Sequence, residues 1–142
     1  MKHLLKVKIY YEDTDCGGVV YYANYLKYFE RARTELLESR GIFLKKLMDE
    51  GIFFVVADAY LKYIEPGRYG DIFSVETWIE KIGGASILFR HRVAREEGVI
   101  LAEGSVKIGC VGRNSRPARL RGDIIESLKD FVQVIPKWTV RQ

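Results

Sequence analysis

The sequence predicts an α+β domain in which an antiparallel β-sheet wraps around one long central α-helix. Residues 25–40 carry apolar side chains at spacings of three and four, which is typical of a helix with one buried face. Residues 52–111 hold four segments rich in β-branched and aromatic residues. Short glycine-containing turns join these segments, and such turns favour antiparallel neighbours.

Composition indicates a single domain that spans residues 1–142. Hydrophobic residues make up 48% and charged residues 30%, as in ordinary globular proteins. The net charge of +4 suits a phosphorylated ligand and is weak evidence for nucleic acid. Two cysteines make no disulfide framework, which favours a reducing compartment. With no signal peptide or membrane-length apolar run, we expect a cytoplasmic protein without a membrane span.

Each expected element follows from its own local pattern. Alternation from Leu5 predicts a first strand, which Tyr10 and Tyr11 extend to an acidic turn. We expect Gly41 to cap the end of the long helix, and Asp123 or its neighbour to cap the start of the last one. The expected strands are 5–11, 52–63, 72–82, 86–95 and 99–111, and the expected helices are 25–40, 42–50 and 123–132. Such long strands favour dimers formed edge to edge or face to face.

The long helix is expected to divide into two faces. The polar face carries Lys27, Glu30, Arg31, Thr34 and Glu38. The spacing places the following residues on the apolar face: Tyr22, Tyr25, Leu26, Phe29, Ala32, Leu36 and Leu37.

A glycine-rich acidic turn, residues 12–18, precedes this helix and is predicted to carry the chemistry of the chain. Asp15 would stand close to the free N–H groups of a helix start, which can stabilise an oxyanion. The alternative is that Asp13 and Asp15 only form turns and cap the helix. A calcium loop would need further acids near Gly17 and Asn24, which are absent. No histidine lies near Cys16 in sequence to activate it as a nucleophile.

Residues 11–25, YEDTDCGGVVYYANY, and 29–35, FERARTE, resemble the opening motif of the hotdog-fold acyl-CoA thioesterases. The most similar group is the Tol–Pal-associated, YbgC-like thioesterases, with the 4-hydroxybenzoyl-CoA thioesterases as relatives. The resemblance implies a hotdog fold of five or six antiparallel strands around one helix. It also implies a homodimer or homotetramer with active sites at the dimer interface.

The same resemblance implies roles for individual residues. The catalytic carboxylate of the family falls on Asp15, and the backbone N–H that polarises the thioester carbonyl falls on Tyr22. Gly18, in the turn between them, falls among the substrate-binding positions. Asp13 falls on a position that is aspartate in both related groups of thioesterases but is not the catalytic one. We expect no cofactor and no metal ion.

Three departures from the family pattern bear on the substrate. Many YbgC-like members have histidine where this chain has Tyr22. A basic run that grips coenzyme A phosphates in the hydroxybenzoyl enzymes is replaced by residues 83–85, and only Ser86 matches. The carboxylate that addresses the substrate phenol falls on Glu30, which is one methylene longer. These departures favour a fatty acyl group over an aromatic substrate that carries a hydroxyl.

A basic loop after the last strand carries Arg113, Arg116, Arg119 and Arg121. We expect Arg116 and Arg119 to hold the nucleotide phosphates of coenzyme A, the alternative being a solvated surface loop. RNA binding would need interleaved aromatic residues, which the loop lacks. His91 lies in a strand pattern and is interpreted as a sheet histidine rather than a catalytic one.

The sequence thus predicts an acyl-CoA thioesterase in which Asp15 acts as a general base or as a nucleophile that forms a mixed anhydride. The pattern does not choose between coenzyme A and acyl carrier protein as the carrier. One alternative is a non-catalytic module that binds acyl-CoA or acyl carrier protein on the same fold. A dehydratase would need a histidine beside an acid, and no such motif stands at the helix. A structural role in a cell-envelope complex is suggested by the family association alone.

Overall fold

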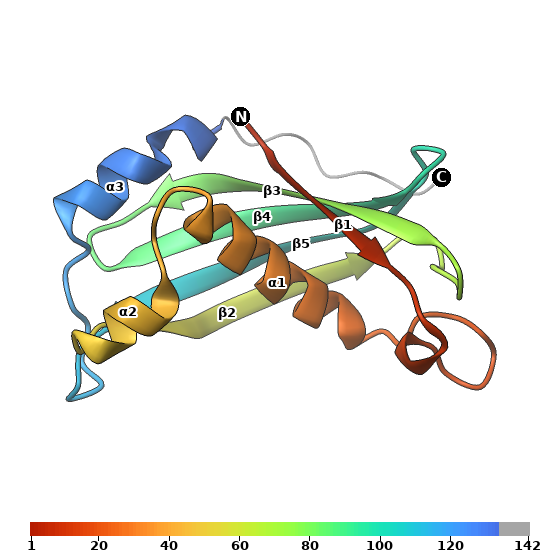
Figure 1. The fold of residues 1–142 in the computed structure, drawn as a ribbon, viewed down its shortest axis with the longest axis horizontal. Coiled ribbons are helices and arrows are strands. Elements are labelled where there is room, and N and C mark those ends of the chain that lie inside the picture. The colour runs from red at the N-terminus through yellow and green to blue at the C-terminus, as the bar shows by residue number, and fades with distance from the viewer. Residues whose placement is uncertain (134–142) are drawn as a thin grey trace.

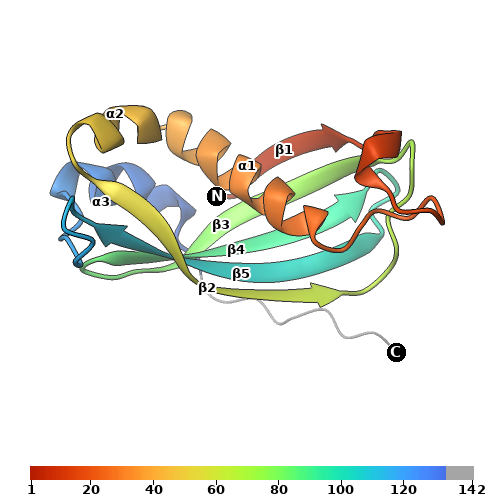
Figure 2. The same cartoon turned by 90° about the horizontal axis from the view of Figure 1, so that it is seen from below.

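The structure, a computed structural model, describes residues 1–133. Its five strands form one sheet in the order β1-β3-β4-β5-β2, and every neighbouring pair is antiparallel. Helix α1 lies across one face of this sheet (Figures 1 and 2), which confirms the predicted α+β class. The elements are β1 (His3–Lys8), α1 (Asn24–Glu38), α2 (Leu44–Asp49), β2 (Phe53–Tyr63), β3 (Ile72–Ile82), β4 (Ser86–Arg95), β5 (Ile100–Val111) and α3 (Gly122–Leu128).

Helix α1 provides one side of the hydrophobic core and packs on β1 and β3. Its apolar spacing buries the expected residues Tyr25, Phe29 and Leu36 against the inward faces of the strands. The prediction was wrong for Tyr22 and Leu26, which are 60% and 41% exposed. The reason is that Tyr22 precedes the helix and Leu26 faces a groove between α1 and β2, so periodicity alone overestimates the buried stripe. Tyr28 and Arg33 are buried instead.

The end of α1 follows the expected capping pattern. Gly41 has a φ of +74°, a left-handed conformation that glycine adopts without steric cost. The amide of Ile42 donates to the carbonyl of Leu37 at 3.0 Å, which uses one of the free carbonyls of the last turn. The chain therefore reverses sharply into α2.

Two boundary predictions were wrong. The first strand ends at Lys8, and a short 3₁₀ turn at Tyr11–Asp13 replaces its expected extension. At the other terminus, α3 ends at Leu128 and a 3₁₀ turn follows. Asp123 does not cap α3, because its carboxylate binds the guanidinium of Arg121 at 3.1 Å.

The two edges of the sheet, β1 and β2, differ in length and side chains. Strand β1 has six residues and carries Lys6 and Lys8, whereas β2 has eleven. On β2, Val56 is 59% exposed and Tyr60 is 50% exposed. A long edge with exposed apolar side chains is a ready template for pairing with another chain. No helix within residues 1–133 is both long enough and apolar enough to cross a bilayer.

Candidate active site

The acidic segment folds into a tight turn at one end of the sheet, beyond the start of α1 (Figure 1). The amide of Asp15 donates to the carbonyl of Val19 at 2.9 Å, and that of Gly18 to the carbonyl of Asp15 at 3.1 Å. Gly18 has a φ of +74°, which lets the chain reverse between Asp15 and Val19. The turn rests on the loop between β2 and β3, because the amide of Val20 donates to the carbonyl of Gly67 at 2.8 Å.

The side chain of Asp15 projects from this turn and is exposed. One of its oxygens, Oδ1, accepts a hydrogen bond from the amide of Gly17 at 2.9 Å. That bond fixes the direction of the carboxylate relative to the turn. The arrangement leaves the group accessible to water or to a substrate carbonyl.

Asp13 differs from Asp15 in that its contacts hold the loop together. Its carboxylate accepts from the amide of Tyr10 at 2.8 Å. Its carbonyl accepts from the amide of Tyr21 at 3.0 Å and from the side-chain amide of Asn24 at 2.8 Å. These bonds tie the turn to the start of α1 and leave Asp13 in a structural position.

Tyr22 lies in the turn before α1 rather than on the helix itself, which begins at Asn24. Its carbonyl accepts a hydrogen bond from the Tyr63 hydroxyl at 2.9 Å. Its amide donates to no group within the described part of the chain. The Tyr22 N–H is therefore a free donor at the positive end of the α1 dipole, in the same loop as Asp15.

A cleft of about 260 Å³ lies beside Tyr22. It is lined by Val19, Tyr22, Tyr25, Tyr63 and Pro66, among others. Burial raises the pKa of the Tyr25 hydroxyl to about 12. The sequence interpretation missed Tyr63, because no local sequence pattern connects a tyrosine at the end of a strand with a turn about forty residues earlier.

The other expected binding residues lie at the opposite end of the sheet. Ser86 opens β4, next to the loop between β5 and α3 that holds Arg116 and Arg119. The amide of Leu120 in that loop donates to the carbonyl of Gly84 at 2.8 Å. Both figures place this loop and the acidic turn at opposite ends of the long axis. One chain therefore does not bring Arg116 and Arg119 to Asp15.

The four arginines of the basic loop region divide into two kinds. Arg113 donates to the carbonyl of Asp49 at 3.0 Å, and Arg121 pairs with Glu50 at 2.9 Å. These two hold the loop against the end of α2. Arg116 and Arg119 are exposed, and their side chains form no hydrogen bond or ion pair within residues 1–133, so they are the members of the cluster that can meet a phosphate.

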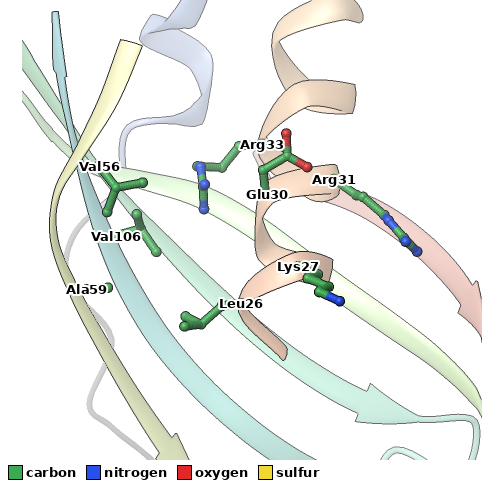
Figure 3. Close-up of a pocket in the computed structure, with 8 residues that line it drawn as sticks. All are labelled: Leu26, Lys27, Glu30, Arg31, Arg33, Val56, Ala59 and Val106. Atoms are coloured by element: carbon green, nitrogen blue, oxygen red, sulfur yellow. The ribbon is translucent and has the colours of Figure 1, made fainter. Parts of the chain in front are cut away.

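A larger groove of about 480 Å³ separates α1 from β2 (Figure 3). Its walls include Leu26 from the helix and Val56, Ala59 and Val106 from the strands, and Arg33 extends into it. The sequence interpretation missed Arg33, although a signal was present. The residue lies one turn after Phe29, where a charged side chain interrupts the apolar stripe.

His91 is confirmed as a buried sheet histidine. Its ring stacks on Phe29 with centroids 4.4 Å apart, and its Nδ1 lies 2.9 Å from the Thr77 hydroxyl. Burial, and secondarily the charge of Arg33, lowers the pKa of His91 well below its usual value. The residue stays neutral beneath α1, in the core and away from the acidic turn.

Neither cysteine forms a disulfide; Cys16 is exposed in the turn and Cys110 is buried. Within residues 1–133, no three histidine, cysteine or acidic side chains gather in a geometry that could hold a metal ion. The groups available for chemistry in the acidic turn are therefore carboxylates, backbone amides and a thiol.

Comparison with known proteins places these features in a family. Residues 17–102 match the family model described as "Thioesterase superfamily". The chain is 38% identical over 124 residues to "Acyl-CoA thioester hydrolase YbgC" of Escherichia coli, an alignment that covers 87% of this chain and 92% of that protein.

Solved structures agree with this assignment. A hypothetical protein, TT1821, from Thermus thermophilus superposes with a TM-score of 0.85 at 34% identity, over 94% of this chain and 99% of that one. A DHNA-CoA thioesterase from Staphylococcus aureus superposes with a TM-score of 0.86 at 26% identity, over 91% and 89% of the two chains. The fold around the acidic turn is therefore the hotdog fold of thioesterases.

Proposed function

The chain belongs to the thioesterase superfamily, and we propose that it hydrolyses acyl-CoA thioesters to a free acid and coenzyme A, with Asp15 as the catalytic carboxylate. The observation that carries the proposal is the pairing, in one loop, of an accessible carboxylate with a free amide. Asp15 is exposed, and the Tyr22 N–H has no hydrogen-bond acceptor among residues 1–133. Thioester hydrolysis needs these two groups, one to activate or perform the attack and one to stabilise the oxyanion.

The Tyr22 amide would act on the thioester carbonyl. During attack the carbonyl oxygen gains negative charge, and a donor fixed before the reaction stabilises that charge without reorganising. The amide precedes α1 by two residues, so the helix dipole adds to its effect. The bond between the Tyr22 carbonyl and the Tyr63 hydroxyl holds this peptide in place.

Asp15 can serve by two routes. As a base it takes a proton from water, the hydroxide attacks the carbonyl carbon, and the tetrahedral intermediate expels coenzyme A thiolate, which is then protonated. As a nucleophile its oxygen attacks the carbonyl carbon, the thiolate leaves, and water hydrolyses the resulting mixed anhydride. Rapid quenching and mass spectrometry separate the routes, because only the second adds an acyl group to the chain.

We further propose a homodimer, or a homotetramer built from such dimers, in which two copies pair through β2. The exposed apolar side chains of this long edge support that surface over the charged edge at β1. A two-fold axis makes the two β2 strands antiparallel, so the acidic turn of one copy approaches the basic loop of the other. Arg116, Arg119 and Ser86 of one copy would then bind the coenzyme A whose thioester meets Gly18 and Asp15 of the partner.

Acyl-CoA and acyl carrier protein thioesters remain separate substrates to test, because the reacting group is the same in both. Two free cysteines suit a reducing compartment, and we place the enzyme in the cytoplasm on that ground.

The decisive experiment measures thiol release from acyl-CoAs of increasing chain length by the wild type, Asp15→Asn and Glu12→Gln. Glu12 is an exposed carboxylate in the same loop and serves as the control. We expect Asp15→Asn to lose about a thousandfold in kcat/KM and Glu12→Gln to stay near wild type. Wild-type turnover by Asp15→Asn would refute its role. Tight binding of acyl-CoA or acyl carrier protein without hydrolysis would instead support a binding module.

A further inference from the structure

Arg33 is the only charged residue of α1 that is buried, with 8% of its surface exposed. Its Nη1 atom has no hydrogen-bond partner within residues 1–133. Figure 3 shows its guanidinium extending from α1 toward Val56 and Val106, into the groove that separates the helix from β2. A buried cation without a counterion is unfavourable, so this position calls for an anion that the single chain does not place there.

Glu30 is the acidic residue that lines the same groove, one turn before Arg33. Burial lowers the pKa of Arg33 to about 10, and the charge of Glu30 opposes this shift in part. The two side chains form no ion pair within 4.0 Å, and the Glu30 carboxylate accepts from the Thr34 hydroxyl at 3.3 Å instead. Figure 3 shows this carboxylate turned away from the guanidinium. Each chain thus presents an acid and a base on its open flank that do not pair with each other.

Glu30 and Arg33 stand between two hollows on this flank. The groove of about 480 Å³ and a smaller hollow of about 140 Å³ share three lining residues, Glu30, Arg33 and Val56. Leu26 lines the groove, and Leu37 lines the smaller hollow. An occupant of both hollows therefore needs apolar side chains toward its two ends and opposite charges at its centre.

The exposed stripe of α1 itself has that pattern. Leu26, Glu30, Arg33 and Leu37 follow one another at spacings of four, three and four residues, which places them in one row along the helix. Read backwards, the row has the same spacings and the opposite order of charges. Two such rows that face each other antiparallel across a two-fold axis place Glu30 against the partner's Arg33. The same register places Leu26 against the partner's Leu37, so the row is complementary to itself.

The β2 edge is level with this row. Val56 and Ala59, near the middle of β2, line the same groove as Glu30 and Arg33, near the middle of α1. Two β2 strands that pair about a two-fold axis at this level form one continuous sheet, with both α1 helices antiparallel on the same face. The grooves of the two copies then open toward each other. Val56, which is 59% exposed in the single chain, is covered by this contact.

We propose that a second copy of the chain fills this groove, and that the dimer is held in register by reciprocal ion pairs between Glu30 of each copy and Arg33 of the other. This inference rests on the homodimer proposed above and names the residues that select the partner. Charges that meet inside an interface discriminate strongly, because a like-charged or unmatched group there is costly. The pair therefore fixes the register of the two helices and rejects a chain with like charges at these positions.

The test exchanges the two charges. Glu30→Arg sets two arginines against each other across the interface, and Arg33→Glu sets two glutamates against each other. The double variant restores opposite charges in a homodimer. A mixture of the two single variants restores them only between different chains, because positions 30 and 33 of each single variant carry like charges. Glu35→Arg is the matched control, since Glu35 is an exposed glutamate of α1 that lines a hollow on the β1 side.

Sedimentation equilibrium should show that each single variant raises the dissociation constant of the dimer at least about a hundredfold, the scale of an unmatched buried charge. The double variant and Glu35→Arg should stay near wild type. Native mass spectrometry of an equimolar mixture of the two single variants, one of which carries a mass tag, should find the mixed dimer in at least about tenfold excess over either homodimer.

Several results would overturn the proposal. They include a monomeric wild type and wild-type association of both single variants. Recovery of the dimer in the double variant, without mixed dimers from the two single variants, would assign the ion pair to one chain. Because a swapped charge can prevent a single variant from folding alone, the two are also co-expressed. A folded mixed dimer from co-expression supports the proposal, and its absence overturns it.

Thiol release from the same samples separates this inference from the proposed function. Hydrolysis that depends on Asp15, in a protein whose association ignores both charge exchanges, would overturn the Glu30–Arg33 pair alone. A dimer that follows the charge exchanges but hydrolyses no thioester would support the pair and overturn the function alone.

Discussion

Helix α1 has one packed flank and one open flank. Toward β1 and β3 the helix meets the core directly, with the ring of Tyr28 5.9 Å from that of Phe73, and beneath it Phe29 stacks on His91. Toward β2 a groove remains, with a buried guanidinium inside and Val56 exposed at its margin. The packed flank accounts for stability, whereas the open flank holds the surfaces that the single chain leaves uncovered. We therefore place the proposed functional surfaces on the side where folding left unsatisfied groups.

The largest effect should come from a charge on the open edge. Val56→Lys places an ammonium in the apolar centre of the proposed β2 interface, so we expect loss of the dimer and a fall in kcat/KM of at least about a hundredfold. The control is Leu4→Lys on β1, where the replaced side chain is 53% exposed. Analytical ultracentrifugation and thiol release measure both properties. An active, dimeric Val56→Lys protein would contradict pairing through β2.

The second prediction asks which copy supplies the basic loop. Arg116→Gln/Arg119→Gln should raise KM for acyl-CoA about tenfold, because two phosphate contacts are lost. Co-expressing this variant with Asp15→Asn should restore one wild-type site in each mixed dimer and about a quarter of the wild-type activity. No recovery in verified heterodimers would show that the loop and Asp15 of the same chain act together.

The third prediction probes the packed flank at Gly104 on β5. A Cβ there would collide with the Phe29 ring and would lie 2.7 Å from the carbonyl oxygen of Tyr60. Gly104→Ala should therefore lower the free energy of unfolding by about 2 kcal/mol. At Gly109 on the same strand, the nearest atom would be 3.7 Å away, an ordinary contact. Urea denaturation should place Gly109→Ala near wild type, and equal losses in the two variants would argue against the tight approach of α1.

The smallest effect concerns His91 and pH. Because burial lowers its pKa in the native state, the unfolded chain binds the extra proton below pH ~6.5 and the native chain does not. Stability should therefore fall as the pH drops below that value, by at most about 1 kcal/mol between pH 6.5 and 5.5. Urea denaturation should show the smallest fall for His91→Asn. Burial also lowers the pKa of His3, so His3→Gln should show a fall between those of His91→Asn and the wild type. Identical slopes in all three proteins would assign the effect to other groups.

Local patterns determined most of the secondary structure. Strands β3 and β4 have the predicted bounds, because strict alternation between short glycine turns has a single interpretation. The helix was predicted to within two residues at each end. The extension of β1 through Tyr10 and Tyr11 was wrong, because the bond from the Tyr10 amide to Asp13 closes a turn that competes with the strand.

The sequence by itself also determined the family and the candidate turn, because the motif around Asp15 is contiguous and its hydrogen bonds are mostly local. Only the tertiary structure decided the rest. It separated Arg116 and Arg119 from Asp15, left Tyr22 and Leu26 exposed and buried Arg33. The physical reason is that helical periodicity specifies a face and a strand pattern specifies an alternation, but the strands on which the helix packs decide how far that face is covered. Which polar groups remain without a partner depends on the packing of the whole folded chain.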